Sequence, residues 1–485
     1  MAKKAPANPV LADLLASVEH ALAVTPSGKL KLRDDATLKT NIRRLAEKSA
    51  LGTSVEQGTA RWLIWEAALA MGVYPASING LYMARGRGET PVNFTVPAMN
   101  LRALTFDCAR AAFRAAERLD AGALLFEIAR SEMSYTFQRP SEYVSSVLAA
   151  AIAEGYTGPV FIQGDHFQVN HKKYLANPEA EVNAVRELAV EAVAAGFYNI
   201  DVDTSTLVDI SLPTIPEQQR ENTRRCAELT AYIRGLEPKG ITISVGGEIG
   251  EVGAKNSTEQ ELRAFMDGYK ADLLEQPVNG KHKRNTVGMS KISIQTGTSH
   301  GGVVNPDGTM AKVQVDFDTL RRLSYVARHE YGMAGAVQHG ASTLPEDAFH
   351  RFPECETAEI HLATNFMTML FDRLPMELRA EIYDWVRANA ADERKAGDTE
   401  DQFLYKSRKK AVGPFKAQMW NLPEDRRANI CGAWEEQFYF LFEQLNIKGT
   451  RALVDLYTKP VLVHKTLADY GAAQKEVEDV TGLAD

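Results

Sequence analysis

The segment that decides the fold is PVFIQGDH at residues 159–166, an apolar run that ends in a polar Gly-Asp-His step. Seven other short runs are similarly rich in strand-forming residues, and amphipathic helical stretches separate them. They lie at residues 93–97, 123–129, 198–203, 241–248, 291–300, 334–342 and 358–364. Eight strands that alternate with helices match the element count of a (β/α)8 barrel, so we expect an α/β protein with a TIM barrel.

The competing architecture is a doubly wound open sheet. In a barrel the carboxyl ends of all strands converge on one face, whereas an open sheet brings them together only at its switch point. Nearly every run in this chain ends in polar residues, as the end of 159–166 illustrates. This repeated ending favours the barrel.

Two flanks lie outside the expected barrel. Residues 1–91 read as helices, with an apolar block at 60–72, and residues 375–485 read as several long helices, with apolar periodicity across 433–445. No Pro-rich or Gly-rich linker separates either flank from the expected barrel. We therefore expect an N-terminal helical extension at 1–91, a barrel at 92–374 and a C-terminal helical extension at 375–485, with both extensions packed on the barrel.

Composition limits the classes of function. The chain has 485 residues, a net charge of -8, 45% hydrophobic and 24% charged residues, which is typical of a globular protein. An acidic chain without a long apolar run indicates neither a nucleic-acid partner nor a membrane partner. Its four cysteines are widely spaced and no signal peptide is recognisable at the start, so we expect a cytoplasmic protein.

Three of the ten histidines, His166, His300 and His339, stand where three predicted strands end. A single histidine in such a place is more often a hydrogen-bonded polar residue than a ligand. Three of them beside Gly or Asp, on strands that converge, predict a metal site. Three imidazoles with one open position are the ligand set of a catalytic Zn²⁺, although cobalt, manganese or iron could occupy the same site.

Carboxylates accompany these histidines at three strand ends, in Asp165, Asp203 and Glu248. A carboxylate beside a divalent ion can transfer a proton or bind the metal, and the alternative is an ordinary loop or helix-capping acid. Asp165 directly precedes His166, so their side chains would point to opposite faces of a regular strand unless the strand end twists.

Small-residue loops at 297–302 (GTSHGG), 340–342 (GAS) and 363–365 (ATN) follow the last three predicted strands. Glycine and small hydroxyl residues let backbone N–H groups close around an anion, and the last loops of a barrel commonly bind phosphate. These loops predict a phosphorylated substrate. The basic run at 406–410 (KSRKK) reads as a solvated helix face, or as a second phosphate contact if the C-terminal helices cover the barrel mouth.

The order of these motifs resembles the class II, metal-dependent aldolases that cleave fructose or tagatose bisphosphate. The similar region spans residues 91–371. Its motifs are VPAMNL at 96–101, ARSEMSYT at 129–136, GDHF at 164–167, FYNIDVDTS at 197–205, GEIG at 247–250, GTSHG at 297–301 and HGAS at 339–342. The resemblance implies reversible retro-aldol cleavage of a phosphorylated ketose to dihydroxyacetone phosphate and an aldehyde.

The resemblance also implies residue roles. Asp165 would move the proton of the cleaved hydroxyl, and His166, His300 and His339 would hold the metal, with Glu248 as an exchanging ligand. A larger set of residues would bind the substrate and its phosphate: Asn100, Ser131, Asp203, Gly301, Gly340, Ser342, His361 and Thr364. Some members of the family use a monovalent cation beside the phosphate. We expect a homo-oligomer, either a dimer or a tetramer.

The chain departs from the family at three places, one of which is Asn305, where the family has a lysine or similar group. His361 stands where the last strand usually has a substrate-binding asparagine, and the loop glutamate that shuttles a proton has no exact counterpart, with Glu251 as the chosen candidate. Two alternatives therefore stay open. One is a non-catalytic stabilising subunit of a tagatose-bisphosphate type aldolase, against which His300 and His339 argue. The other is a related lyase or epimerase that uses His361 as an acid or base.

Overall fold

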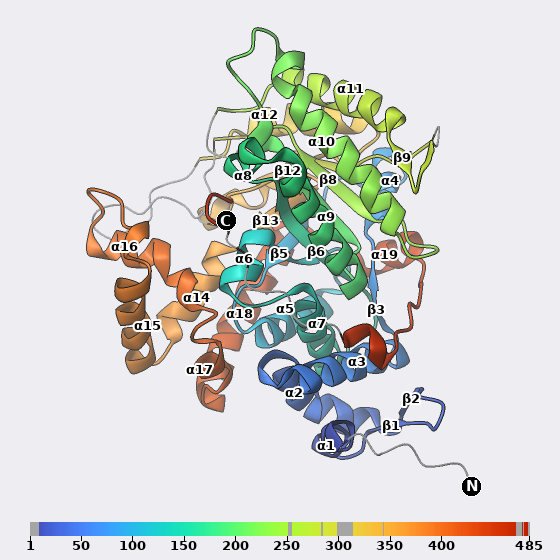
Figure 1. The fold of residues 1–485 in the computed structure, drawn as a ribbon, viewed down its shortest axis with the longest axis vertical. Helices are drawn as coiled ribbons and strands as arrows, with labels where there is room; N and C mark the ends of the chain where they lie inside the picture. The colour runs from blue at the N-terminus through green and yellow to red at the C-terminus, as the bar shows by residue number, and fades with distance from the viewer. Residues whose placement is uncertain are drawn as a thin grey trace.

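The structure is a computed structural model that describes residues 9–250, 255–282, 285–297, 314–342, 344–471, 478 and 480–483. Within these ranges no helix is both long and apolar enough to cross a bilayer. The described residues comprise a central barrel with helices around it and extensions at both ends (Figure 1).

Eight parallel strands form the barrel, which confirms the predicted fold class. They are β4 (Val96–Asn100), β5 (Leu125–Ala129), β6 (Gly158–Gln168), β7 (Asn199–Asp203), β8 (Ser244–Glu248), β11 (Lys291–Ile294), β12 (Ala336–Gln338) and β13 (Glu359–Leu362). The pairs β13–β4 and β6–β7 complete the ring, so these eight strands form a closed barrel. Each of the eight predicted runs contains residues of one strand.

The first strand begins later than the sequence indicates. The run at 93–97 is only partly extended sheet, because β4 starts at Val96 and closes with Asn100. The preceding residues contact the C-terminal extension instead, where the Thr95 amide donates to the Leu445 carbonyl at 2.9 Å. The shift places Asn100 at a carboxyl end of the barrel.

Helices cover the outside of the barrel between consecutive strands (Figure 1). They include α5 (Thr105–Leu119), α6 (Arg130–Tyr135), α7 (Pro140–Glu154), α9 (Pro178–Ala195), α10 (Ile215–Leu236), α11 (Glu259–Glu275), α12 (Phe317–His329) and α14 (Thr364–Arg373). Helix α9 stops at Gly196, whose φ of 114° lets its amide bond back to the Ala192 carbonyl.

The N-terminal extension is not purely helical, so that prediction is wrong in two places. It contains α1 (Pro9–Ser17), a hairpin of β1 (Leu22–Val24) and β2 (Leu30–Leu32), α2 (Asp35–Leu51), α3 (Ser54–Ala70), β3 (Val73–Ala76) and α4 (Asn79–Gly86). Strand β3 pairs with the first half of β6, while β7 pairs with the second half. The 11-residue β6 is long enough for both partners, and β3 buries four apolar or aromatic residues there.

The C-terminal extension is helical, as expected. It contains α15 (Met376–Asn389), α16 (Glu400–Ser407), α17 (Lys416–Trp420), α18 (Glu424–Gln444) and α19 (Arg451–Tyr457). Helix α18 packs on α5 and α14, and the buried Trp434 indole donates to the Phe366 carbonyl at 3.1 Å. One continuous hydrophobic core joins the barrel and both extensions.

The two extensions meet the same barrel helix, α7. The buried Glu142 carboxylate lies 2.5 Å from Lys416 Nζ of the C-terminal extension and 3.6 Å from Arg61 of the N-terminal extension. The extensions are therefore packed on the barrel. The division at residues 91 and 375 stays a prediction, because the core runs across both boundaries.

Candidate metal centre

A bulge at the end of β6 places two consecutive functional side chains in the barrel interior. The register with β7 shifts between Gly164 and Phe167, and His166 has a φ of 38°. The Phe167 ring folds back over Gly164, where an added Cβ would lie 2.3 Å from the ring, so only glycine fits. Asp165 and His166 are both buried, at 5% exposure each, instead of facing opposite sides of a regular strand.

His166 and His339 face each other across the end of the barrel. His166 Nε2 lies 3.0 Å from His339 Nδ1, while the outer nitrogens contact Asp203 Oδ2 at 2.9 Å and Ser293 Oγ at 3.0 Å. If both rings are neutral, with the protons on His166 Nδ1 and His339 Nε2, then His166 Nε2 and His339 Nδ1 point their lone pairs at each other. A cation between them would relieve that repulsion, which is the arrangement expected of two metal ligands.

Glu248 completes this group at the end of β8. Its Oε2 lies 3.4 Å from His166 Nδ1, and Gln295 donates to its Oε1 at 2.9 Å. One ligand atom each from His166, Glu248 and His339 lies within 4.8 Å of the others. Burial raises the pKa of Glu248 to about 7. Two imidazoles and one carboxylate fit a divalent transition metal.

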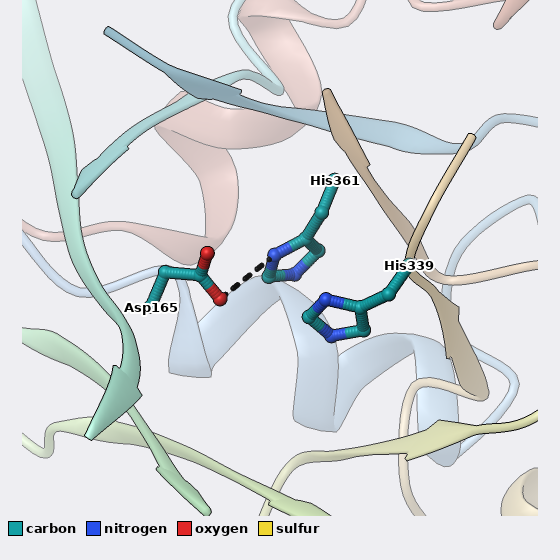
Figure 2. Close-up of side chains that lie close together, drawn as sticks. All are labelled: Asp165, His339 and His361. Carbon is teal, nitrogen blue, oxygen red and sulfur yellow. Dashed lines mark ion pairs between the residues drawn. The ribbon is translucent and has the colours of Figure 1, made fainter. Parts of the chain in front are cut away.

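Asp165 lies beside this group and also contacts β13. Its Oδ1 is 3.7 Å from His166 Nε2 and 3.2 Å from His361 Nδ1, and Figure 2 shows the carboxylate directed at the His361 ring. Burial favours the neutral acid, but the neighbouring imidazoles of His166 and His361, whose own pKa values are raised so that they are charged when no metal is bound, outweigh burial and hold the pKa of Asp165 well below its usual range. The His361 ring stacks 4.0 Å from that of His339.

The barrel interior contains a charged layer that the sequence analysis missed. Lys291 Nζ donates to Gln163 Oε1 at 2.7 Å and to Asp201 Oδ2 at 3.0 Å, and it also contacts Glu359. All of these side chains are buried, as is Glu127. Barrel interiors are usually filled by bulky branched apolar residues, so this layer is unusual. The available signal was a single charged residue inside otherwise apolar strands, as in LFEIA at 125–129.

The expected substrate residues are distributed around the strand ends. Asn100 donates to Glu132 at 2.6 Å and accepts from Arg102 at 3.2 Å, and Ser131 is buried in α6. Asp203 bonds to His166 as described. His361 lies in the interior layer rather than in an open cleft: it is 6% exposed.

The loops after β12 and β13 meet, as a shared phosphate site would require. Gly340 follows His339 with a φ of 67°, and Ser342 Oγ accepts the Ala363 amide at 2.7 Å. Thr364 begins α14. Three predicted residues lie outside the described part of the chain: His300, Gly301 and Glu251.

The basic run at 406–410 only partly follows the solvated-face interpretation. Lys406 is exposed and bonds to Asp398 at 2.8 Å, but Arg408 is buried with its guanidinium 4.8 Å from the Phe371 ring. Lys409 faces inward, where burial and the charge of Arg102 lower the pKa of its ammonium to about 7. Part of the run therefore lies near the barrel mouth.

A closed barrel with candidate imidazole and carboxylate ligands at the carboxyl ends of its strands is the arrangement seen in metal-dependent barrel enzymes. Residues 91–419 match the family model described as Fructose-bisphosphate aldolase class-II, so the chain belongs to this family. Members of the family usually bind a divalent metal. No curated protein sequence matches the chain.

Two solved structures share the fold at low identity. A probable tagatose 6 phosphate kinase from Sinorhizobium meliloti 1021 is 16% identical with a TM-score of 0.52, over 75% of this chain and 99% of that chain. The fructuronate-tagaturonate epimerase UxaE from Cohnella laeviribosi is 11% identical with a TM-score of 0.50, over 73% of this chain and 82% of that chain. Both likenesses show the fold alone.

Proposed function

We propose that this chain is a metal-dependent class II aldolase that reversibly cleaves a phosphorylated ketose of the fructose-1,6-bisphosphate kind. The products would be dihydroxyacetone phosphate and an aldehyde. The observation that carries the proposal is the pair of facing imidazoles of His166 and His339, with the Asp165 carboxylate 3.7 Å from His166. Membership of the aldolase family supports the same reaction.

The metal would be held by His166, His339 and Glu248, with His300 as the further imidazole that the sequence predicts. When bound there, a divalent ion such as Zn²⁺ would polarise the ketose carbonyl and stabilise the negative charge that develops on its oxygen. Asp203 and Ser293 orient the two imidazoles. A monovalent cation beside the phosphate stays a prediction.

Asp165 would act on the hydroxyl of the carbon just beyond the bond that breaks. Its carboxylate takes the hydroxyl proton, the carbon–oxygen bond becomes a carbonyl, and the electron pair of the broken carbon–carbon bond stays with the dihydroxyacetone phosphate half. In synthesis the same group returns the proton. Glu251, the predicted donor to the new carbanion, lies outside the described residues.

The other predicted contacts would hold the substrate. Asn100, Ser131, Asp203 and His361 would position the sugar chain. Backbone amides at Gly301 and Gly340, with Ser342 and Thr364, would bind phosphate where the two loops meet α14. A net charge of -8 disfavours an anionic substrate in general, so the guanidinium of Arg102 near the strand ends would help to offset it.

The protein would be a cytoplasmic homo-oligomer, either a dimer or a tetramer. Its partners would be the ketose phosphate and dihydroxyacetone phosphate, with neither nucleic acid nor membrane among them.

A substrate screen with product analysis tests the proposal. Full-length protein loaded with Zn²⁺, Co²⁺ or Mn²⁺ would be incubated with a panel of ketose mono- and bisphosphates. Release of dihydroxyacetone phosphate is expected for at least one of them. An epimerised sugar without cleavage would favour the related epimerase, and protein that binds no metal and changes no substrate would favour the stabilising subunit.

A further inference from the structure

We propose that a basic pocket on the outside of the barrel binds a small phosphorylated metabolite that carries hydroxyl groups, such as a sugar phosphate or a polyol phosphate. The pocket has a volume of about 700 Å³ and lies between α2, α5 and α18. In the described part of the chain, none of its lining residues belongs to the metal centre or to the expected substrate contacts. The site therefore goes beyond the proposed function.

All three parts of the chain build this pocket. Helix α2 belongs to the N-terminal extension, α5 to the barrel and α18 to the C-terminal extension, and α18 packs on α5 (Figure 1). Arg43 of α2 ties the two extensions together: its Nη2 donates to the Trp420 carbonyl at 2.7 Å, and its guanidinium lies 5.3 Å from the centroid of the Trp420 ring. The walls are therefore packed helices, which suits a preformed binding site.

Cations predominate among the charged side chains of the pocket. Burial lowers the pKa of Arg43, and the nearby charges of Arg110 and Arg427 lower it further against the opposing effect of Asp107. The cations thus lie close enough to repel one another, and an anion between them would relieve this repulsion. The basic lining residues are Lys39, Arg43, Arg110, Arg114 and Arg427.

Lys39 and Arg427 are the cations most available to an anion. Neither forms an ion pair within the described residues, and Arg427 donates only through Nε, to the Leu422 carbonyl at 3.1 Å. Arg110 donates to Glu154 through Nε at 2.5 Å, so its outer Nη groups also face a ligand in the pocket. Guanidinium and ammonium groups in this arrangement bind phosphate oxygens.

A buried carboxylate gives the pocket a second kind of partner. Asp107 lines it from α5 and is 2% exposed. The charges of four arginines reach this carboxylate, but among the residues that the structure describes none lies within ion-pair distance, and its Oδ2 accepts no hydrogen bond. Such a buried acceptor is unfavourable, and a hydroxyl group of a ligand would satisfy it. Cations beside Asp107 therefore favour a phosphate ester with hydroxyl groups over a plain phosphate ion, which the carboxylate would repel.

Calorimetric titration of chelator-treated, full-length protein with sorbitol 6-phosphate tests the site. This polyol phosphate has no carbonyl group, so aldol cleavage cannot accompany its binding. We expect Arg427→Gln to weaken binding by about tenfold or more, because it removes charged hydrogen bonds to the phosphate. The matched control is Arg426→Gln: Arg426 precedes Arg427 on α18 but is exposed and does not line the pocket, so this variant should bind like the wild type.

Two further variants identify the site and its ligand class. His339→Ala removes a proposed metal ligand and should retain the binding, which separates the pocket from the metal centre. Asp107→Asn should lower the preference for sorbitol 6-phosphate over inorganic phosphate by about fivefold, because only the polyol has hydroxyl groups that donate to the carboxylate. The repulsion between this carboxylate and phosphate cancels in the ratio of the two dissociation constants.

Absence of saturable binding, equal affinity of Arg426→Gln and Arg427→Gln, or loss of binding in folded His339→Ala would overturn the inference. An unchanged preference in Asp107→Asn would also overturn it and would indicate a general anion site. If Arg427→Gln does not fold, Lys39→Gln on the α2 wall takes its place. The outcome is separate from that of the proposed function: cleavage without this binding would leave the function standing, and binding without cleavage would leave the pocket standing.

Discussion

Asp203 Oδ2 lies 2.9 Å from His166 Nδ1, although the two residues belong to adjacent strands, β7 and β6, and are separated by 37 positions in the sequence. The other oxygen of Asp203 accepts the amide and hydroxyl of Ser205, at 3.0 and 2.7 Å. The carboxylate is therefore fixed by its own loop and in turn orients the imidazole. This relationship links the local turn chemistry of β7 to the metal centre.

Asp203→Asn should weaken metal binding by about 10–100-fold, because it removes the negative charge that faces His166 and replaces one of the two acceptor oxygens by an NH2 group, which cannot accept. The dissociation constant would be measured by competition with a chromophoric chelator. Asp209→Asn is the matched control, since Asp209 accepts from Ser211 in the same kind of turn but on the surface. Equal affinity in the two variants would show that Asp203 does not support a metal ligand.

Lys291→Met should lower the free energy of unfolding by about 3–5 kcal/mol, because the buried carboxylates of Asp201 and Glu359 would lose their ammonium partner. Urea denaturation of chelator-treated protein would measure it. The exposed Lys281→Met should change the free energy by no more than about 0.5 kcal/mol. A loss below about 1 kcal/mol for Lys291→Met would mean that the interior carboxylates are not both ionised.

Asp316 caps the N-terminus of α12 and should give a pH-dependent contribution to stability. Hydrogen bonds from Thr319, and less so from Asn256, hold the pKa of Asp316 below its usual value of 3.8. Because the folded-state pKa is depressed, the contribution is complete above about pH 4 and is lost as the pH falls through the folded-state value.

The difference in unfolding free energy between wild type and Asp316→Asn should therefore stay constant from pH 6 down to about pH 4 and shrink as the pH is lowered further to 3. Asp318→Asn, in the first turn of the same helix, provides the control for an acid that makes no cap. A difference that is independent of pH would rule out this assignment.

Lys465 joins both extensions to the barrel. Its ammonium lies 3.3 Å from the centroid of the Trp65 ring and donates to the Ala194 carbonyl at 2.7 Å, and the Trp65 indole donates to Val463. Lys465→Met should destabilise the protein by about 1–3 kcal/mol. The exposed Lys459→Met provides the comparison in denaturant unfolding, and equal stability of the two would argue against this contact.

Much of the barrel could be predicted from sequence because the strand signal is local. Apolar runs such as PVFIQGDH at 159–166 predict both the strand and the polar residues that end it. The approach of His166 to His339 was predictable for the same reason, since barrel strands bring their carboxyl ends together. The aldolase resemblance agreed with these placements, and the family match over 91–419 bears the family assignment out.

The remaining features depend on contacts that no local pattern encodes. The bulge that turns Asp165 and His166 inward needs the close approach of Phe167 to Gly164, and β3 is a strand only because β6 offers a partner. The charged residues of the interior layer around Lys291 are isolated from one another in the sequence, and only the closed ring of strands brings them together. These are tertiary effects that override periodicity.

The most direct test of the account is metal titration of dihydroxyacetone phosphate release, with the wild type and Asp165→Asn side by side. The account predicts no cleavage after chelation, recovery as Zn²⁺, Co²⁺ or Mn²⁺ is returned, and a kcat about 10²–10⁴-fold lower in Asp165→Asn. Metal-loaded wild type that cleaves no ketose phosphate, or cleavage that survives removal of the metal, would contradict it.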